Sequence, residues 1–119
     1  MSEILIVSSH TPYSGLQADD ALDAALAASN VGLRVSVLFE SHGVFQLLLG
    51  QQTDATVNQL TEKRIKALPM FDIEDIYYCK QSADQLLPEE SALSTIAKPL
   101  VNQTDIERLI DAHQHVLRF

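Results

Sequence analysis

The sequence lacks several features of secreted and membrane proteins. It contains one cysteine, Cys79, so no disulfide can form within the chain, and this favours a reducing compartment. No apolar run approaches the roughly 18 residues of a membrane-spanning helix, and the acidic start at Glu3 lacks the basic residues of a secretory signal. These absences predict a cytoplasmic protein that has no contact with a membrane.

Basic residues are also scarce. The chain has 8 Lys and Arg against 16 Asp and Glu, which gives a net charge of −8. Proteins that grip nucleic acid usually present a basic face, because contacts with phosphates supply most of the affinity. The one basic cluster, Lys63, Arg64 and Lys66, has the spacing of a solvated helix face. We therefore expect no direct binding of nucleic acid by this chain alone.

Glycine and proline number only 4 each, and no segment is rich in Pro, Gly or Ser. Hydrophobic residues make up 46% of the 119 residues, a length close to the commonest domain size. This composition predicts one compact domain over residues 1–119 without disordered tails.

What is present is an alternation of two patterns. Short apolar runs predict strands within residues 3–9, 33–39, 73–79, 93–101 and 115–119. Helical spacing of apolar residues, with capping boxes at Ser82 and Thr104, predicts helices within residues 19–29, 44–49, 60–68, 82–87 and 104–113. The alternation predicts an α/β three-layer sandwich, in which helices cover both faces of a mostly parallel five-stranded sheet. Pro99 restricts its strand to an edge or a bulge.

In such sheets, sites form outside the carboxyl ends of the strands. The loop after the first strand, residues 8–15, has a single glycine and no phosphate-binding motif, which argues against a nucleotide site. His113 and His115 fall on a helix end and a strand start, and no second ligand pair stands at zinc spacing. We expect no metal and no cofactor.

Cys79 is the sharpest candidate for chemistry. It ends a predicted strand, it precedes Ser82 as a predicted helix N-cap, and Lys80 is its neighbour. These features favour the thiolate, the form that attacks sulfur or carries a persulfide. His10 and His42 also follow strands, so either could approach the same edge as a proton acceptor. The alternative is that Cys79 is a small buried hydrophobe, and the residues alone leave both interpretations open.

The 43–50 segment, GVFQLLLG, is unusually apolar for so short a helix. One face can enter the core, and the rest needs another cover, for which a partner subunit is one candidate. A deeply buried helix is the other, and both stay open. The subunit-interface residues predicted here are Val44, Phe45, Gln46, Leu47 and Leu48.

Residues 43–51, GVFQLLLGQ, resemble the G-V-F-Q-L-L-x-G-Q signature of the TusC/DsrF branch of the DsrE/DsrF/DsrH-like proteins. Further matches are the opening strand, the helix start at residues 20–23, residues 71–74, and the C-terminal residues 116–119. The resemblance covers essentially the whole chain.

The resemblance implies a place in a heterohexamer with TusB- and TusD-like sister subunits. Such complexes relay persulfide sulfur from a cysteine desulfurase and a small carrier protein toward the enzyme that makes 2-thiouridine at the tRNA wobble position. Homologous complexes of the DsrEFH type serve dissimilatory sulfur oxidation, and the shared motifs leave both pathways open.

In this family the essential cysteine belongs to the TusD-type sister. Cys79 holds the corresponding strand-end position, but residues 80–86 replace the sister's small residues and Arg-Gly pair. The resemblance therefore implies an accessory, structural subunit of a sulfurtransferase complex. Two alternatives are a subunit that carries sulfur on Cys79 and a homo-oligomeric module that binds a small molecule.

Overall fold

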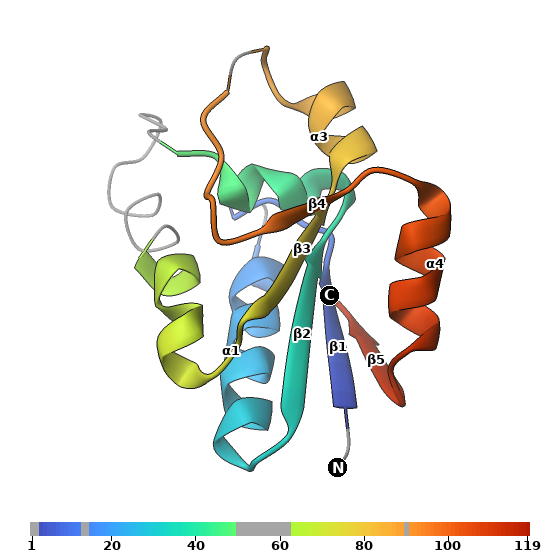
Figure 1. Cartoon of the computed structure of the whole chain (residues 1–119). Helices are drawn as coiled ribbons and strands as arrows, with labels where there is room; N and C mark the ends of the chain where they lie inside the picture. The colour runs from blue at the N-terminus through green and yellow to red at the C-terminus, as the bar shows by residue number, and fades with distance from the viewer. Residues whose placement is uncertain (1–2, 13–14, 50–62, 90) are drawn as a thin grey trace.

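The computed structural model describes residues 3–12, 15–49, 63–89 and 91–119 (Figure 1). The described strands form one five-stranded sheet in the order β4-β3-β2-β1-β5, and every pairing in it is parallel. The strands are β1 (Glu3–Ser8), β2 (Arg34–Phe39), β3 (Asp75–Cys79), β4 (Lys98–Leu100) and β5 (His115–Arg118). The helical elements are α1 (Gln17–Asn30), η1 (Ser41–Leu47), η2 (Leu68–Phe71), α3 (Lys80–Leu86) and α4 (Gln103–Asp111), with helical residues at 63–67 before η2.

The sheet lies between two helical layers, as the alternating pattern predicted. On one face, α1, residues 63–67 and η2 cover a core that includes Ile6, Val37 and Ile76. On the other face, α4 covers a smaller core that includes Leu5 and Leu38 (Figure 1). The predicted α/β three-layer sandwich is confirmed. None of the helices that the structure describes has both the length and the apolar character needed to cross a bilayer.

The fourth strand is shorter than predicted. Only Lys98–Leu100 pair with β3, because residues 91–97 turn away to meet η1 through an antiparallel bridge between Leu48 and Leu93. Pro99 lies in an edge strand, as expected, where a missing backbone N–H is tolerated.

Several predicted helix boundaries are wrong, and three of them bear on the fold. Helical structure does not stop before Pro69 but continues through it as η2, since a proline in the first turn of a helix costs no hydrogen bond. α4 begins at Gln103 after Asn102, so the capping box at Thr104 does not mark its start. η1 is a 3-10 helix that begins at Ser41, three residues before the predicted start at Val44. The predicted loop at residues 51–59 lies outside the described residues.

The parallel arrangement brings all strand ends to one edge of the sheet. The register pairs Ser8 with Phe39, Val7 with Arg118, and Cys79 with Leu100. Residues that follow different strands in the sequence, including the starts of η1 and α3, therefore meet at this carboxyl edge.

Candidate functional site

Cys79 ends β3, and α3 begins with the next residue. Its backbone is extended, with φ −77° and ψ 109°, and its Sγ atom accepts the backbone N–H of Ser82 at 3.5 Å. The sulfur thus occupies the N-cap position of the helix. The residue is 8% exposed and packs with Val7, Leu38 and Ile106. In this conformation the thiol offers little surface to another molecule.

Ser82 was predicted as the N-cap of this helix, and that prediction is wrong. The helix begins two residues earlier, at Lys80, because the extended backbone of Cys79 already marks its start. The hydroxyl of Ser82 instead accepts the backbone N–H of Ser41 at 3.0 Å. It therefore joins α3 to η1, two elements that follow different strands.

Lys80 was predicted to support a thiolate at Cys79. Its Nζ atom lies 2.8 Å from Oδ1 of Asp84, one turn further along α3. This hydrogen bond and the attraction of the same carboxylate raise the pKa of Lys80 above its usual 10.5. Asp84 thus holds the ammonium group, and the only hydrogen bond to Sγ within the described residues comes from Ser82.

His10 and His42 both lie at the carboxyl edge, as predicted, but neither imidazole is hydrogen-bonded to Cys79 in the described part of the chain. His42 stacks on Phe45, with ring centroids 6.3 Å apart, and its Nδ1 lies 3.3 Å from the Ser41 hydroxyl. The carbonyl oxygen of His10 accepts a hydrogen bond from Gln46 at 3.0 Å. Among the described residues, neither His10 nor His42 is therefore paired with Cys79 for direct proton transfer.

The 43–50 segment is divided between the interior and the surface; Gly50 lies outside the described residues. Val44, Gln46 and Leu47 are buried inside this chain, so their side chains are already covered. Phe45 and Leu48 are half-buried and pack against α3. Of the five predicted interface residues, only these last two present side-chain surface to a partner in this conformation.

Gly43 and Gln46 fix η1 against the end of β1. A Cβ atom at Gly43 would lie 1.9 Å from the backbone oxygen of Ser8, so only glycine fits there. The amide of Gln46 donates from Nε2 to the hydroxyl of Ser8 at 2.7 Å and to the His10 carbonyl. The glycine and glutamine of the signature therefore serve the packing of this chain.

One ionic cluster at this edge was not predicted. Oε1 of Glu40 lies 3.5 Å from Nη1 of Arg118 and accepts the hydroxyl of Ser9 at 3.4 Å. It links the ends of β1, β2 and β5. The sequence positions of these residues could have predicted the cluster, since all three stand at the end of a predicted strand and parallel strands end at one edge of the sheet.

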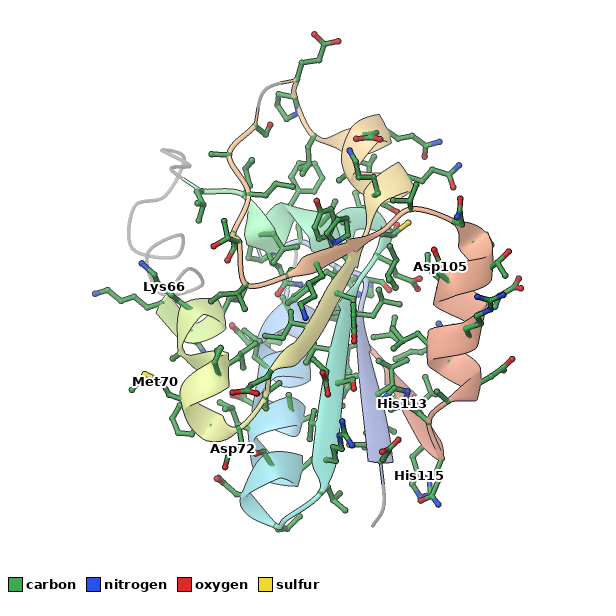
Figure 2. All side chains as sticks on the ribbon, in the orientation of Figure 1. Lys66, Met70, Asp72, Asp105, His113 and His115 are labelled. Atoms are coloured by element: carbon green, nitrogen blue, oxygen red, sulfur yellow. The ribbon has the colours of Figure 1, made fainter. Side chains whose placement is uncertain are left out.

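The two remaining histidines lie apart, at the other end of the sheet (Figure 2). Nδ1 of His113 donates to the Leu109 carbonyl at 2.7 Å, since a carbonyl oxygen can only accept, and Nε2 lies 2.8 Å from the Ser36 hydroxyl. Within the described ranges, no group of three or more His, Cys, Asp or Glu side chains could hold a metal ion.

A family model described as the DsrE/DsrF-like family matches residues 2–119. The chain belongs to the DsrE/DsrF-like family. This confirms the resemblance drawn from the 43–51 motif. Among the relatives of this DsrE/DsrF-like chain, "Protein TusC homolog" of Pseudomonas aeruginosa is 32% identical over 114 residues, covering 96% of this chain and 95% of that protein. "Protein TusC" of Escherichia fergusonii is 32% identical over 120 residues and the full length of both.

A third relative, "Protein TusC homolog" of Vibrio vulnificus, is 36% identical over 85 residues, which are 71% of this chain and 72% of that protein. Among solved structures, the YchN protein from E. coli superposes with a TM-score of 0.81 over the full length of both chains, at 20% sequence identity. At that identity the likeness shows a shared fold. The DsrE/DsrF-like chain thus matches TusC proteins in sequence and YchN in architecture.

Proposed function

We propose that this chain is an accessory, structural subunit of a TusBCD-type sulfur-relay complex in the cytoplasm. Its sister subunits would be TusB- and TusD-like, in a heterohexamer that passes persulfide sulfur toward 2-thiouridine formation at the tRNA wobble position. Contact with the small sulfur carrier and with the thiolation enzyme would be indirect. The single observation that carries the proposal is the match to proteins named TusC over the full length of both chains.

The state of Cys79 supports a structural role over a sulfur-carrying one. A persulfide carrier must present its sulfur to a donor and then to an acceptor, whereas Cys79 is 8% exposed and caps α3. The described edge also provides no imidazole hydrogen-bonded to it. The chain therefore has the fold of a sulfur-relay subunit, but its thiol is poorly placed for transfer.

The surface that we assign to the sister subunits is centred on Phe45 and Leu48. These two side chains are half-buried, lie on η1 and its end, and pack against the buried cluster of Val44, Ala83 and Leu87. A partner that covers them would complete the burial of an apolar cluster that this chain leaves partly open. This surface lies at the carboxyl edge of the sheet, because η1 follows β2.

Co-expression tests the assembly directly. The tagged chain should co-purify with TusB- and TusD-like subunits and elute with them as one complex whose mass is set by light scattering. Truncation of both Phe45 and Leu48 to alanine should weaken the complex by about tenfold or more, because buried aromatic and aliphatic anchors dominate interface energies. Met70→Ala is the matched control, since Met70 is 84% exposed and lies on η2 at the other end of the sheet. A chain that stays monomeric beside its sisters would refute the proposal.

A second candidate function is that Cys79 itself carries sulfur, which its position at the carboxyl end of β3 favours. The chain would be incubated with a persulfide donor, and the adducts would be mapped by mass spectrometry. We expect no added sulfur on Cys79, and full tRNA thiolation by a complex that carries Cys79→Ser. A sulfur adduct on Cys79 together with loss of thiolation in the variant would establish this second function instead.

The pathway served is a separate question, because complexes of the DsrEFH type act in sulfur oxidation. Deletion of the gene in its host separates the two. Loss of 2-thiouridine from tRNA supports the proposal, whereas intact thiolation with impaired sulfur oxidation assigns the chain to the other pathway.

A further inference from the structure

The two edge strands of the sheet differ in how they are protected. β4 has three residues, two of which are Lys98 and Pro99, and both lysine and proline disfavour pairing with a further strand. β5 has four residues without Lys or Pro, and three of them are exposed (Figure 1). Beyond β5 the described chain places no further strand. The edge at β5 is therefore the one left open to pairing.

The backbone of β5 has hydrogen-bonding groups that point away from the sheet. Phe119, which follows β5, donates its N–H to the Val7 carbonyl at 2.8 Å, and its carbonyl accepts the N–H of Ser9 at 2.9 Å. Both bonds lie on the β1 side. Because successive residues of an extended strand direct these groups to opposite sides, Val116 and Arg118 direct theirs to the outer side. Each of these two residues offers one donor and one acceptor to an added strand.

The side chains of β5 leave this outer backbone uncovered. Nη1 of Arg118 lies 3.5 Å from Oε1 of Glu40, which follows β2. Since β1 lies between β5 and β2, the guanidinium reaches across the sheet and away from its outer edge. Leu117 lies on the same face as its register neighbour Ile6, which is fully buried, yet Leu117 is 44% exposed. An apolar residue of an added strand would cover this leucine.

The charge of this edge indicates which kind of strand fits it. Residues 112–119 contain His113, His115 and Arg118 but no Asp or Glu, in a chain with 16 acidic side chains. His115 is exposed at the start of β5 (Figure 2). A second copy of β5 would bring the same basic side chains to the edge, without a carboxylate to pair with them. An acidic segment of another protein supplies that carboxylate.

We propose that β5 is the docking site for an extended, acidic segment of another protein, which pairs with it as an added antiparallel strand. An apolar residue of the segment lies opposite Leu117, and its carboxylates lie opposite Arg118 and His115. The site does not include the Cys79 thiol or the Phe45–Leu48 surface. It is therefore independent of the sulfur-relay proposal, and either can fail without the other.

The probe is the peptide acetyl-Thr-Val-Glu-Val-Thr-Glu-Thr-amide, whose central valine would lie opposite Leu117 and whose glutamates would lie opposite Arg118 and His115. Titration of the full ¹⁵N-labelled chain should shift the backbone amides of Val116 and Arg118 in a saturable way. N-Methylation of the first glutamate removes an N–H that points to β5, and it should weaken binding about fivefold. N-Methylation of the central valine is the matched control, since that N–H points away from β5, and it should leave binding unchanged.

Charge and side-chain contact are tested separately. Replacement of both glutamates of the peptide by lysine should weaken binding about threefold, because exposed ion pairs are lost. Leu117→Lys should weaken binding of the original peptide about fivefold or more, because it places a charge where an apolar contact forms. Val101→Lys is the matched control, since Val101 is 63% exposed and follows β4 at the opposite edge. The amide spectrum checks that each variant is folded.

The outcomes that would overturn the proposal are distinct. They are the absence of saturable shifts, equal effects of the two N-methyl groups, tighter binding of the lysine peptide, and an equal effect of Val101→Lys. A second copy as the occupant gives a different result, in which Leu117→Lys removes self-association of the isolated chain in sedimentation equilibrium. We expect Leu117→Lys to leave that self-association unchanged.

Discussion

Gly43 is the described residue at which the fold leaves no room for a side chain. A Cβ there would lie 1.9 Å from the Ser8 carbonyl oxygen, and that oxygen accepts a hydrogen bond from the backbone N–H of Glu40. The clash is with backbone of the central strand β1, which cannot move without breaking the sheet. Gly43 therefore sets how closely η1 approaches the end of β1.

Gly43→Ala should lower the free energy of unfolding by at least about 3 kcal/mol, because no side-chain rearrangement relieves the contact. Gly32→Ala is the comparison. At φ 87° it strains the backbone, but its Cβ meets nothing within 4 Å, so the cost should be about 1–2 kcal/mol. Urea unfolding followed by circular dichroism measures both. Equal losses in the two variants would show that η1 can shift away from β1.

The pH dependence of Lys80 follows from its ion pair with Asp84. The carboxylate raises the pKa of the ammonium above its usual 10.5, so the pair contributes fully at neutral pH. Its contribution is lost as the pH rises through the pKa of the folded state. Asp84→Asn should move the pKa of Lys80 back toward 10.5, measured by the ¹³Cε shift of the lysine. An unchanged titration in the variant would show that the exposed pair does not persist in solution.

At the scale of elements, two hydrogen bonds hold the start of α3 in addition to its apolar packing against η1. The sulfur of Cys79 caps its first turn, and the hydroxyl of Ser82 binds the backbone of η1. Cys79→Ala should cost about 1 kcal/mol of stability through loss of the cap. Ser82→Ala should cost a similar amount through loss of one hydrogen bond.

Hydrogen exchange distinguishes the two roles where stability does not. Cys79→Ala should speed exchange at the amide of Ser82, whereas Ser82→Ala should speed exchange at the amide of Ser41. If Ser82→Ala instead exposed the amides of the first turn of α3, the serine would be the cap after all.

The existence of the strands and helices was predictable because it depends on local periodicity, but the 3-10 type of η1 was not. All five strands lie within predicted apolar runs such as residues 3–9, and their parallel pairing follows from the alternation with helices. The apolar runs did not distinguish the buried β1 and β2 from β4 and β5, which are mostly exposed. The residues at which helices and strands begin and end were harder to predict. The start of α3 depends on the extended backbone of Cys79, and β4 is short because Leu93 bridges to Leu48. Such contacts between distant residues leave no periodic pattern in the sequence.

The candidate site shows the same division. That Cys79, His10 and His42 reach one edge followed from the parallel topology. The hydrogen bonds at this edge could not be predicted from the topology, because they depend on side-chain geometry. Lys80 is hydrogen-bonded to Asp84, and the Ser82 hydroxyl is hydrogen-bonded to η1. The sequence also could not predict which side chains of the 43–50 segment enter the core and which stay at the surface, since apolar residues occupy all sides of that segment.

At the scale of the whole molecule, two features act in opposite directions on association. A net charge of −8 favours repulsion between two copies, and we expect it to disfavour the binding of polyanions such as tRNA to the isolated chain. The half-buried Phe45 and Leu48 favour contact with any apolar surface, including that of a second copy. Which feature dominates depends on salt, because screening shortens the range of the repulsion to about 10 Å at 0.1 M ionic strength.

The isolated chain should therefore self-associate weakly, and more strongly as salt rises from about 0.05 to 0.5 M, where the charge repulsion is screened and the apolar contact is not. Sedimentation equilibrium measures the change. Truncation of Phe45 and Leu48 to alanine should remove most of the association at high salt, and Met70→Ala should leave it unchanged. Association that weakens as salt is added would mean that charge pairs, rather than this apolar surface, hold the copies together. It would also argue against Phe45 and Leu48 as the surface that binds the sister subunits.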